Sequence, residues 1–256
     1  MPVFDVPNIA LRILLITGQD AIIREDACVC FVVSGGFMVF MRETGALPGT
    51  CLIVGAAPGA LSIEIRPGDL CVAADGGGKA LEALGIAPDM VIGDFDSSFP
   101  PEDIPAIRLN PEKDVTDLYA AVQIGKERGY GSFLLYGALG GSWGHSAGNL
   151  QILAGLAREG FGAAIIAEGV RVSALHSGSL TLASSHGRRV SVLAHGGSAE
   201  GVTLMGMRYP LNNAALDCFF PLGVSNEILG DEAEITVKQG TLMIFQEEST
   251  PPAHIY

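Results

Sequence analysis

The chain is poor in basic residues. Only 15 Lys and Arg stand against 28 Asp and Glu, which gives a formal net charge of −13. Nucleic-acid backbones and anionic lipids are bound through clustered Lys and Arg, so this balance argues against nucleic acid and membrane surfaces as partners. Acidity on its own is mainly a solubility property and does not by itself indicate a metal site.

The chain also lacks a cysteine pattern. Its five cysteines are an odd number, and no Cys-x-x-Cys pair occurs, so neither a disulfide framework nor a structural zinc site is expected. Four of the five lie in apolar runs, which predicts buried, reduced thiols. The cysteines are Cys28, Cys30, Cys51, Cys71 and Cys218.

No long hydrophobic run is present. The most apolar uncharged stretch, from Ala27 to Met41, falls short of the roughly 20 residues that span a bilayer. The N-terminus has no basic region ahead of a short apolar core, so no secretory signal is expected. These features predict a cytoplasmic protein.

The hydrophobic content of 48% is enough for a substantial core in one large domain or two ordinary ones. Residues 1–48 carry apolar runs separated by turn signals, which predicts a small β-rich extension with no evident chemistry and no assigned role. These runs are Ile9–Ile16, Val29–Val33 and Phe37–Met41, the last two flanking a Gly35-Gly36 turn.

Residues 49–168 alternate short apolar runs with segments of helical periodicity. Continuous apolar strands alternating with helices predict a parallel α/β sheet that is covered on both faces. The expected strands are Cys51–Val54, Leu70–Ala74, Met90–Ile92, Ala106–Leu109, Phe133–Tyr136 and Ala163–Ile166. The expected helices are Lys79–Leu84, Asp117–Arg128 and Ser146–Arg158.

From residue 169 to 256 the helical period disappears, and short apolar runs recur between glycine-rich turns. This spacing predicts a separate all-β domain, a β-sandwich, after the α/β domain. The runs are Val170–Leu175, Leu180–Ala183, Val190–Ala194, Gly201–Met205, Glu234–Val237 and Leu242–Phe245.

A P-loop is missing. The nearest candidate, Gly76-Gly77-Gly78-Lys79-Ala80, has alanine where the metal-binding hydroxyl of that motif stands. A glycine turn entering a helix can still present backbone N–H groups to an anion. The alternative is a tight strand-to-helix turn with Asp75 as its cap.

Acidic residues follow three consecutive strand ends. Asp75 ends one apolar run, Asp94 and Asp96 end the next, and Asp114 and Asp117 open a helix. The carboxyl ends of parallel strands meet at one edge of a sheet, where α/β proteins bind ligands. Mg²⁺ takes one or two carboxylates together with phosphates and water. The alternative for each acid is a solvated cap of the following segment.

The spacing of Asp94 and Asp96 places their side chains differently from that of the residue between them. Asp94 and Asp96 are separated by Phe95 alone, so a carboxylate can face a metal while the phenylalanine packs back on the protein.

This ordered series of motifs resembles thiamin pyrophosphokinase. The resemblance covers about residues 51–246 and leaves the first 48 unexplained. In the α/β part it rests on Asp75-Gly76-Gly77, Pro88-Asp89, Gly93-Asp94-Phe95-Asp96-Ser97, Asp114-Val115-Thr116-Asp117 and the run from Gly140-Gly141 through His145 to Asn149-Leu150. In the all-β part it rests on residues 206–213 and 223–227, which resemble that family's thiamin-side motifs.

The resemblance implies an enzyme that transfers a pyrophosphoryl group from ATP to the hydroxyl of thiamin, giving thiamin diphosphate and AMP. It implies that Asp94, Asp96 and Asp117 hold Mg²⁺ on the triphosphate. Asp75 is implied to help place the metal-nucleotide or the incoming alcohol, which makes these four acids the expected catalytic set.

The resemblance further implies a homodimer with shared active sites, in which Ser225 and Asn226 serve the nucleotide of the partner chain. The expected substrate-binding residues are Gly76, Gly77, Ser97, Asp114, Thr116, Gly141, His145, Asn149, Asn213, Ser225 and Asn226.

The chain departs from the family pattern at one loop. The family commonly has Gly-Gly-Arg-x-Asp-His, whereas Ser142 and Gly144 stand here in place of the Arg and the Asp. Arginine offers phosphate a fixed fork of donors that serine lacks, so Lys79, Lys113 or Arg208 are candidates to replace it.

Two other functions remain open from the sequence. Asp94-Phe95-Asp96-Ser97 also resembles the nucleophile loop of haloacid-dehalogenase-type phosphatases, although the further lysine and acidic motif of that group are not evident. The loss of the Arg and Asp at residues 142 and 144 would also suit a non-catalytic thiamin or nucleotide-binding homologue.

Overall fold

The computed structural model describes residues 28–33, 37–42, 49–95, 103–110 and 115–247. It forms two units, residues 1–45 and residues 46–256. In the first unit, β1 (Cys28–Val33) pairs antiparallel with β2 (Phe37–Arg42). The two predicted strands are present there. The predicted run Ile9–Ile16 and the Gly35-Gly36 turn lie outside the described residues.

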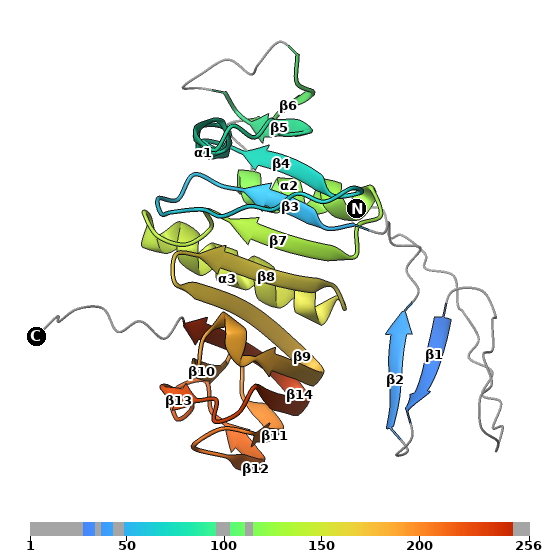
Figure 1. The fold of residues 1–256 in the computed structure, drawn as a ribbon, viewed down its shortest axis with the longest axis vertical. Coiled ribbons are helices and arrows are strands. Elements are labelled where there is room, and N and C mark those ends of the chain that lie inside the picture. The colour runs from blue at the N-terminus through green and yellow to red at the C-terminus, as the bar shows by residue number, and fades with distance from the viewer. Residues whose placement is uncertain (1–27, 34–36, 43–48, 96–102, 111–114, 248–256) are drawn as a thin grey trace, which may run out of the picture. The chain divides into compact units, whose positions relative to one another are not determined.

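The second unit is built on a parallel sheet with the strand order β8-β7-β3-β4-β5-β6 (Figure 1). The central strands are apolar throughout and buried on both faces, as continuous rather than alternating apolar runs predict. The strands are β3 (Cys51–Val54), β4 (Leu70–Ala74), β5 (Met90–Gly93), β6 (Ala106–Arg108), β7 (Ser132–Tyr136) and β8 (Gly162–Ala167).

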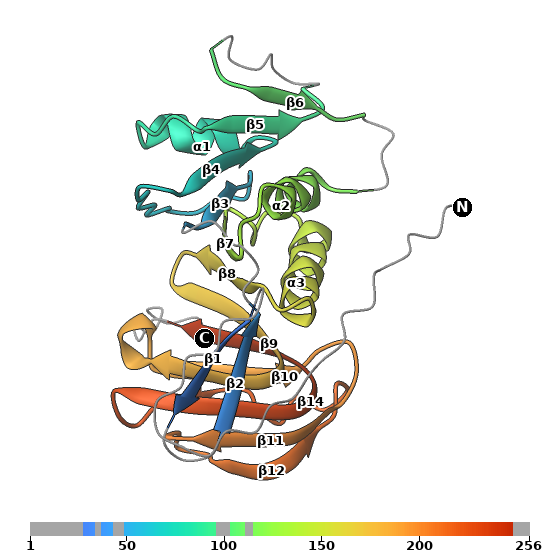
Figure 2. The same ribbon diagram turned by 90° about the vertical axis from the view of Figure 1, so that its right-hand side faces the viewer.

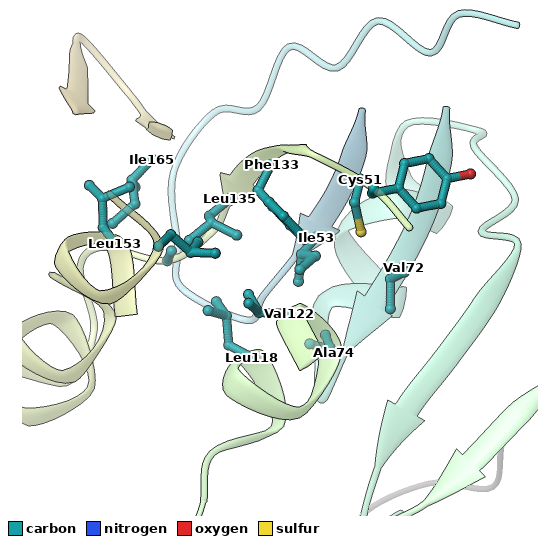
Figure 3. Packing of buried hydrophobic residues seen from close by; sticks show 14 of the residues in the cluster. Cys51, Ile53, Val72, Ala74, Leu118, Val122, Phe133, Leu135, Leu153 and Ile165 are labelled. Carbon is teal, nitrogen blue, oxygen red and sulfur yellow. The ribbon is translucent and has the colours of Figure 1, made fainter. Parts of the chain in front are cut away.

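Helices cover both faces of this sheet. The helices α2 (Asp117–Glu127) and α3 (Trp143–Arg158) lie on one face, and α1 (Gly77–Ala83) lies on the other (Figure 2). On the first face Leu118 and Leu153 pack with Ile53, as Figure 3 shows from close by. On the opposite face Leu81 of α1 packs with Leu52, the residue before Ile53 in β3. The expected α/β fold with a doubly covered parallel sheet is therefore present.

The strands after residue 169 are joined to the parallel sheet by backbone pairing. The strand β9 pairs antiparallel with β8, and β14 pairs with β9 along most of its length. The full sheet has 12 strands. The strands are β9 (Val170–Ala183), β10 (Arg189–Ala194), β11 (Ala199–Met205), β12 (Leu211–Leu216), β13 (Asn226–Glu227) and β14 (Glu232–Glu247), with a short 3-10 turn at Ser184–His186.

The prediction of four separate short strands here was wrong. Val170–Leu175 and Leu180–Ala183 belong to the single strand β9, and Glu234–Val237 and Leu242–Phe245 belong to β14. The polar residues between the runs do not interrupt the strands, because ladder hydrogen bonds are made by the backbone. A register shift between Val237 and Thr241 absorbs the irregular residues of β14.

The strands β9 and β14 contribute residues to two hydrophobic cores. Val172 and Met243 pack in the core of the parallel sheet beneath α2 and α3. Further along the same strands, Leu182 and Ile235 pack in a second core with residues of β10, β11 and β12. The predicted boundary at residues 168 and 169 falls at the β8–β9 turn, where pairing between strands continues across it.

The cysteines of β3 and β4 are buried, as predicted. Cys51 and Cys71 are free and buried, and desolvation raises their pKa values to about 12 and about 11. Cys218 is free and exposed. None of the helices in the described ranges is long and apolar enough to cross a membrane.

Candidate active site

A cavity of about 210 Å³ opens at the carboxyl ends of β3, β4 and β7. This is the sheet edge at which the sequence places the acidic junctions. Its walls come from the turns after these strands and from the first turns of α2 and α3. The lining residues are Gly55, Ala56, Ala57, Pro58, Ala74, Asp75, Thr116, Asp117, Leu118, Gly137, Ala138, Gly140, Gly141, Ser142, His145 and Asn149.

Glycines let two of these turns approach each other closely. The backbone N–H of Gly55 donates to Tyr136 O at 2.8 Å, and that of Ala57 donates to Gly137 O at 2.9 Å. A Cβ on Gly55 would lie 2.7 Å from the Gly137 carbonyl oxygen. The turns after β3 and β7 therefore form one rigid floor under the cavity.

The turn after β4 needs glycine at one position and tolerates a side chain at the next. A Cβ on Gly77 would collide with the carbonyl oxygen of Val54, whereas a Cβ on Gly78 would meet no atom within 4 Å. We predict that Gly77→Ala destabilises the protein by about 3 kcal/mol, in the range of overpacked cores. The matched Gly78→Ala should stabilise it by about 0.5 kcal/mol, since alanine is the better helix former.

Urea unfolding of the two variants measures both effects. The close packing of α1 against β3 would be contradicted if the two variants were equally stable.

Asp75 is held on the rim of the cavity by its backbone. Its φ of 50° is left-handed, a conformation that Asp tolerates better than most residues, and its N–H donates to Ile92 O at 2.8 Å. The side chain is exposed and lines the cavity. A Cβ on Gly93 would lie 3.6 Å from Asp75 Cα, so the junctions after β4 and β5 are neighbours.

Phe95 packs back on the protein, as predicted. Its ring joins the core on the α1 face, and the Arg108 guanidinium lies 5.8 Å from the ring centroid. The φ of 56° is an outlier for a bulky residue and marks a strained backbone next to Asp94. Asp94 is half-buried at the end of β5 and is not among the residues that line the cavity.

Asp117 begins α2 and lines the same cavity as Asp75. Thr116 caps this helix, because its Oγ1 accepts from the N–H of Tyr119 at 3.2 Å. Thr116 also lines the cavity. The expected residues Asp96, Ser97 and Asp114 lie outside the described residues.

The loop after β7 is fixed by two polar residues of α3 that are mostly buried. Asn149 Nδ2 donates to Ala138 O at 2.7 Å, and the N–H of Gly140 donates to Ser146 Oγ at 3.1 Å. Asn149 was expected from the sequence, whereas Ser146 was missed because a serine within a helix has no distinctive pattern. These bonds set the shape of the wall that includes Gly141, whose φ is 66°.

The start of α3 contributes Ser142 and the expected residue His145 to this wall. Ser142 is the N-cap, and its Oγ accepts from the N–H of His145 at 3.4 Å. His145 is exposed and lines the cavity. The first turn of α3 therefore lies at the cavity, where the partial positive charge of a helix N-terminus favours an anion.

The donor set at the cavity fits Mg²⁺ bound together with a phosphate. Asp75 and Asp117 place two carboxylates on the cavity wall, and Mg²⁺ characteristically binds carboxylate oxygens together with substrate phosphates and water. Within the described ranges no group of three or more His, Cys, Asp or Glu forms a complete protein cage for a metal. Asp94 follows the neighbouring strand.

The three expected residues of the antiparallel region lie apart from this cavity. Asn213 has a φ of 50°, and its Oδ1 accepts from Lys238 Nζ at 2.7 Å. Ser225, with a φ of 60°, donates its N–H to Ser191 Oγ at 3.1 Å. Asn226 is 4% exposed. None of the three lines the cavity of its own chain.

Two family models match the chain in sequence. Residues 64–165 match "Thiamin pyrophosphokinase, catalytic domain", and residues 179–242 match "Thiamin pyrophosphokinase, vitamin B1 binding domain". Together the two ranges span well over half of the chain. The chain belongs to the thiamin pyrophosphokinase family.

Individual relatives agree with this membership. The thiamine pyrophosphokinase of Bacillus subtilis (strain 168) is 26% identical over 185 residues, which are 69% of this chain and 86% of the relative. A solved thiamin pyrophosphokinase from Geobacillus thermodenitrificans has a TM-score of 0.70 at 25% identity and matches over 78% of this chain and 98% of its own. The Bacillus subtilis structure has a TM-score of 0.72 at 23% identity, over 78% of this chain and all of its own, which shows the shared fold.

Membership of the thiamin pyrophosphokinase family excludes the phosphatase alternative. It leaves the question of which groups replace the family's Arg and Asp at residues 142 and 144. Among the described residues that line the cavity, none is Lys or Arg. Lys79 is exposed on α1 outside the lining, and Arg208 is paired with Glu227 at 3.1 Å. Lys113 lies outside the described residues. Neither Lys79 nor Arg208 lines the cavity of its own chain.

Proposed function

We propose that this chain transfers the pyrophosphoryl group of ATP to the hydroxyl of thiamin, giving thiamin diphosphate and AMP. The observation that carries the proposal is the pair Asp75 and Asp117 on a glycine-lined cavity at the carboxyl edge of the parallel sheet. This cavity is built largely from the range that matches the catalytic-domain model.

The triphosphate of ATP is the group that suits this cavity. Backbone N–H groups of the glycine loops and the first turn of α3 can donate to phosphate oxygens without a basic side chain. Asn149 and Ser146 hold this wall in shape before the substrate binds, so little ordering is needed on binding.

We propose that Asp94, Asp96 and Asp117 hold Mg²⁺ on the triphosphate and that Asp75 places the metal-nucleotide or the thiamin hydroxyl. When bound, Mg²⁺ neutralises the charge that develops on the transferred phosphate oxygens. The remaining contribution of the chain is alignment, because phosphoryl transfer needs the attacking and leaving oxygens in line. Thr116 and His145 line the same cavity and orient groups within it.

We further propose a homodimer with shared sites, in which the C-terminal strands form a β-sandwich that binds thiamin. The segment between β12 and β13 exposes four large apolar side chains, Phe219, Phe220, Leu222 and Val224. A patch of this kind on a folded protein marks an interaction surface. Because Ser225 follows Val224 directly, a second copy seated there would contact the segment that holds residues 225 and 226. The dimer and a cytoplasmic location stay predictions from the sequence.

The product assay tests the proposed function. Purified protein incubated with ATP, Mg²⁺ and thiamin should form AMP and thiamin diphosphate in equal amounts, as measured by ion-exchange chromatography. Formation of ADP would indicate transfer of a single phosphoryl group. Binding of both substrates without any product would favour the non-catalytic homologue.

The missing arginine leads to a prediction about Ser142. We predict that Ser142→Arg changes the KM for ATP by about tenfold and the KM for thiamin by less than about twofold, because residue 142 lines the phosphate cavity. Ser142→Ala is the matched control for loss of the helix cap, which costs about 1 kcal/mol of stability. Steady-state kinetics with each substrate varied in turn measures both effects, and equal changes in both KM values would contradict the placement of this loop.

A further inference from the structure

The backbone of Phe95 has a conformation that is unusual for a bulky residue. Among the described residues, five that are not glycine have a left-handed φ. Four of them have short polar side chains, namely Asp75, Ser177, Asn213 and Ser225. Phe95, with a φ of 56°, is the one with a large apolar side chain. Strain of this kind persists only where the surrounding structure holds it, and it is concentrated at functional sites.

Two contacts of the Phe95 ring hold this conformation. The ring packs against the hydrophobic core on the α1 face of the sheet. The guanidinium carbon of Arg108 lies 5.8 Å from the ring centroid, within the range of a cation–π interaction. None of the described carboxylates forms an ion pair with Arg108. The contact that this charge makes in the described part of the chain is therefore with the ring.

The parallel sheet fixes the position of Arg108 relative to Phe95. Arg108 is the last residue of β6 and lies opposite Gly93 in the register of β5 and β6. The N–H of Leu109, the next residue, donates to Gly93 O at 2.9 Å. Gly93 is only two residues before Phe95. Because this pairing is made by the backbone, removal of the guanidinium would release the ring without breaking the sheet.

The restraint on Phe95 bears on acidic residues of the candidate site. Asp94 precedes Phe95 and Asp96 follows it, so the backbone conformation of Phe95 sets the direction of one acid relative to the other. This junction adjoins the rim of the cavity, since a Cβ on Gly93 would lie 3.6 Å from Asp75 Cα. Residues that orient metal ligands from behind commonly tune the affinity of a site for its metal.

We propose that Arg108 is a positioning residue that acts through Phe95 to direct Asp94 and Asp96 toward Mg²⁺. The inference rests on the proposed function for the role of these two acids. Arginine suits the task, because a planar guanidinium stacks on an aromatic face and a lysine ammonium does not. Arg108 does not line the cavity, so it is not assigned to contact with the substrate.

Binding of Mn²⁺, a paramagnetic substitute for Mg²⁺, tests this inference without turnover. Titration of the full chain, followed by electron paramagnetic resonance in the absence of nucleotide, gives the Kd. Arg108→Gln should raise this Kd by about three- to fivefold, because an exposed cation–π contact can shift a conformational balance by no more than its own free energy. Phe95→Leu should have at least this effect, and adding Arg108→Gln to it should change nothing further, since both substitutions remove the same contact.

Kinetics should show a matching split. In Arg108→Gln the Mg²⁺ concentration that gives half-maximal activity should rise by the same factor, while the KM for thiamin changes by less than about twofold. Arg108→Lys should keep the Kd for Mn²⁺ within about twofold of the wild-type value, because an ammonium group can still interact with the ring. Arg66→Gln is the matched control and should leave the Kd unchanged. It removes the same charge from an exposed arginine that pairs with Glu64 at 3.1 Å and does not line the cavity.

Thermal unfolding separates positioning from a purely structural role. A lower Tm of Arg108→Gln with an unchanged Kd for Mn²⁺ would overturn the inference, as would additive effects in the double variant. Weaker binding of metal-free ATP with an unchanged Kd for Mn²⁺ would also overturn it, because Arg108 would then contact the phosphates directly.

The fold should tolerate these changes at Arg108, because its side chain is exposed at the end of the sheet order. If Arg108→Gln does not fold, Arg108→Met keeps the apolar stem and carries the same expected rise in Kd. A wild-type protein that binds no Mn²⁺ would refute the inference. A wild-type protein that binds Mn²⁺ and shows the predicted shifts in Kd but forms no AMP would count against the proposed function alone.

Discussion

Replacing Asp117 with asparagine is expected to lower kcat/KM by about a thousandfold at ordinary Mg²⁺ concentrations, the scale of loss when one preorganised charged group is removed from a transition state. Asp117 shares the cavity with Asp75, and asparagine keeps the size of the side chain while removing its charge. The helix should persist, because Thr116 remains as its cap. The lost interaction with the helix dipole costs only about 0.5 kcal/mol.

Steady-state kinetics and thermal unfolding separate the effect on activity from any effect on folding. Higher Mg²⁺ should restore part of the activity of Asp117→Asn, because one charged ligand is missing and the phosphates remain. Asp231→Asn is the control, since Asp231 is exposed and outside the cavity. Wild-type turnover in Asp117→Asn would remove Asp117 from the metal site.

The second large effect is expected at the apolar patch. The paired change Phe219→Glu with Phe220→Glu should convert the proposed dimer to monomers and lower activity by at least about a hundredfold. The two rings are 93% and 64% exposed, so their replacement should not disturb the monomer fold. Four glutamates facing each other across a two-fold axis would repel, and two aromatic anchors per chain would be lost.

Sedimentation velocity measures the assembly state, and the product assay measures activity on the same samples. Leu84→Glu is the control, because Leu84 is also an exposed apolar residue, 43% accessible, at the end of α1. A folded, monomeric double variant with full activity would show that each chain carries a complete site. A double variant that remains dimeric would place the interface elsewhere.

The parallel part of the fold was predictable because its strands are buried on both faces. Cys51–Val54 and Leu70–Ala74 are the observed bounds of β3 and β4, since an uninterrupted apolar run has no other stable location than the middle of a covered sheet. The helix α2 was equally clear, because its apolar face repeats at the helical period and Thr116 caps its start.

The antiparallel part was less predictable. The strand β12, with the sequence Leu-Asn-Asn-Ala-Ala-Leu, has too little alternation to stand out, and β13 is only two residues long. The continuation of the sheet through β9 and β14 depends on backbone pairing that leaves no pattern in the side chains. The arrangement of these antiparallel strands therefore depends on pairing between distant segments, which the local sequence does not predict.

Some features of the candidate site could likewise be predicted from the sequence, and others could not. The acids Asp75 and Asp117 could be predicted to converge, because each follows or begins an element whose end lies at the same sheet edge. The hydrogen bonds between Asn226 and Tyr209 could not, since they join segments 17 residues apart that have no recognisable pairing pattern. The same holds for Ser146, whose partner Gly140 is in a turn.

Tracing the phosphates of ATP tests the central claim most directly. With ATP labelled at the β-phosphate, the label should appear in thiamin diphosphate and be absent from AMP, because the β- and γ-phosphates move together to the thiamin hydroxyl. ATP labelled at the α-phosphate should leave its label in AMP. Label from the β-phosphate recovered in ADP or in free phosphate, with none in thiamin diphosphate, would contradict pyrophosphoryl transfer by this chain.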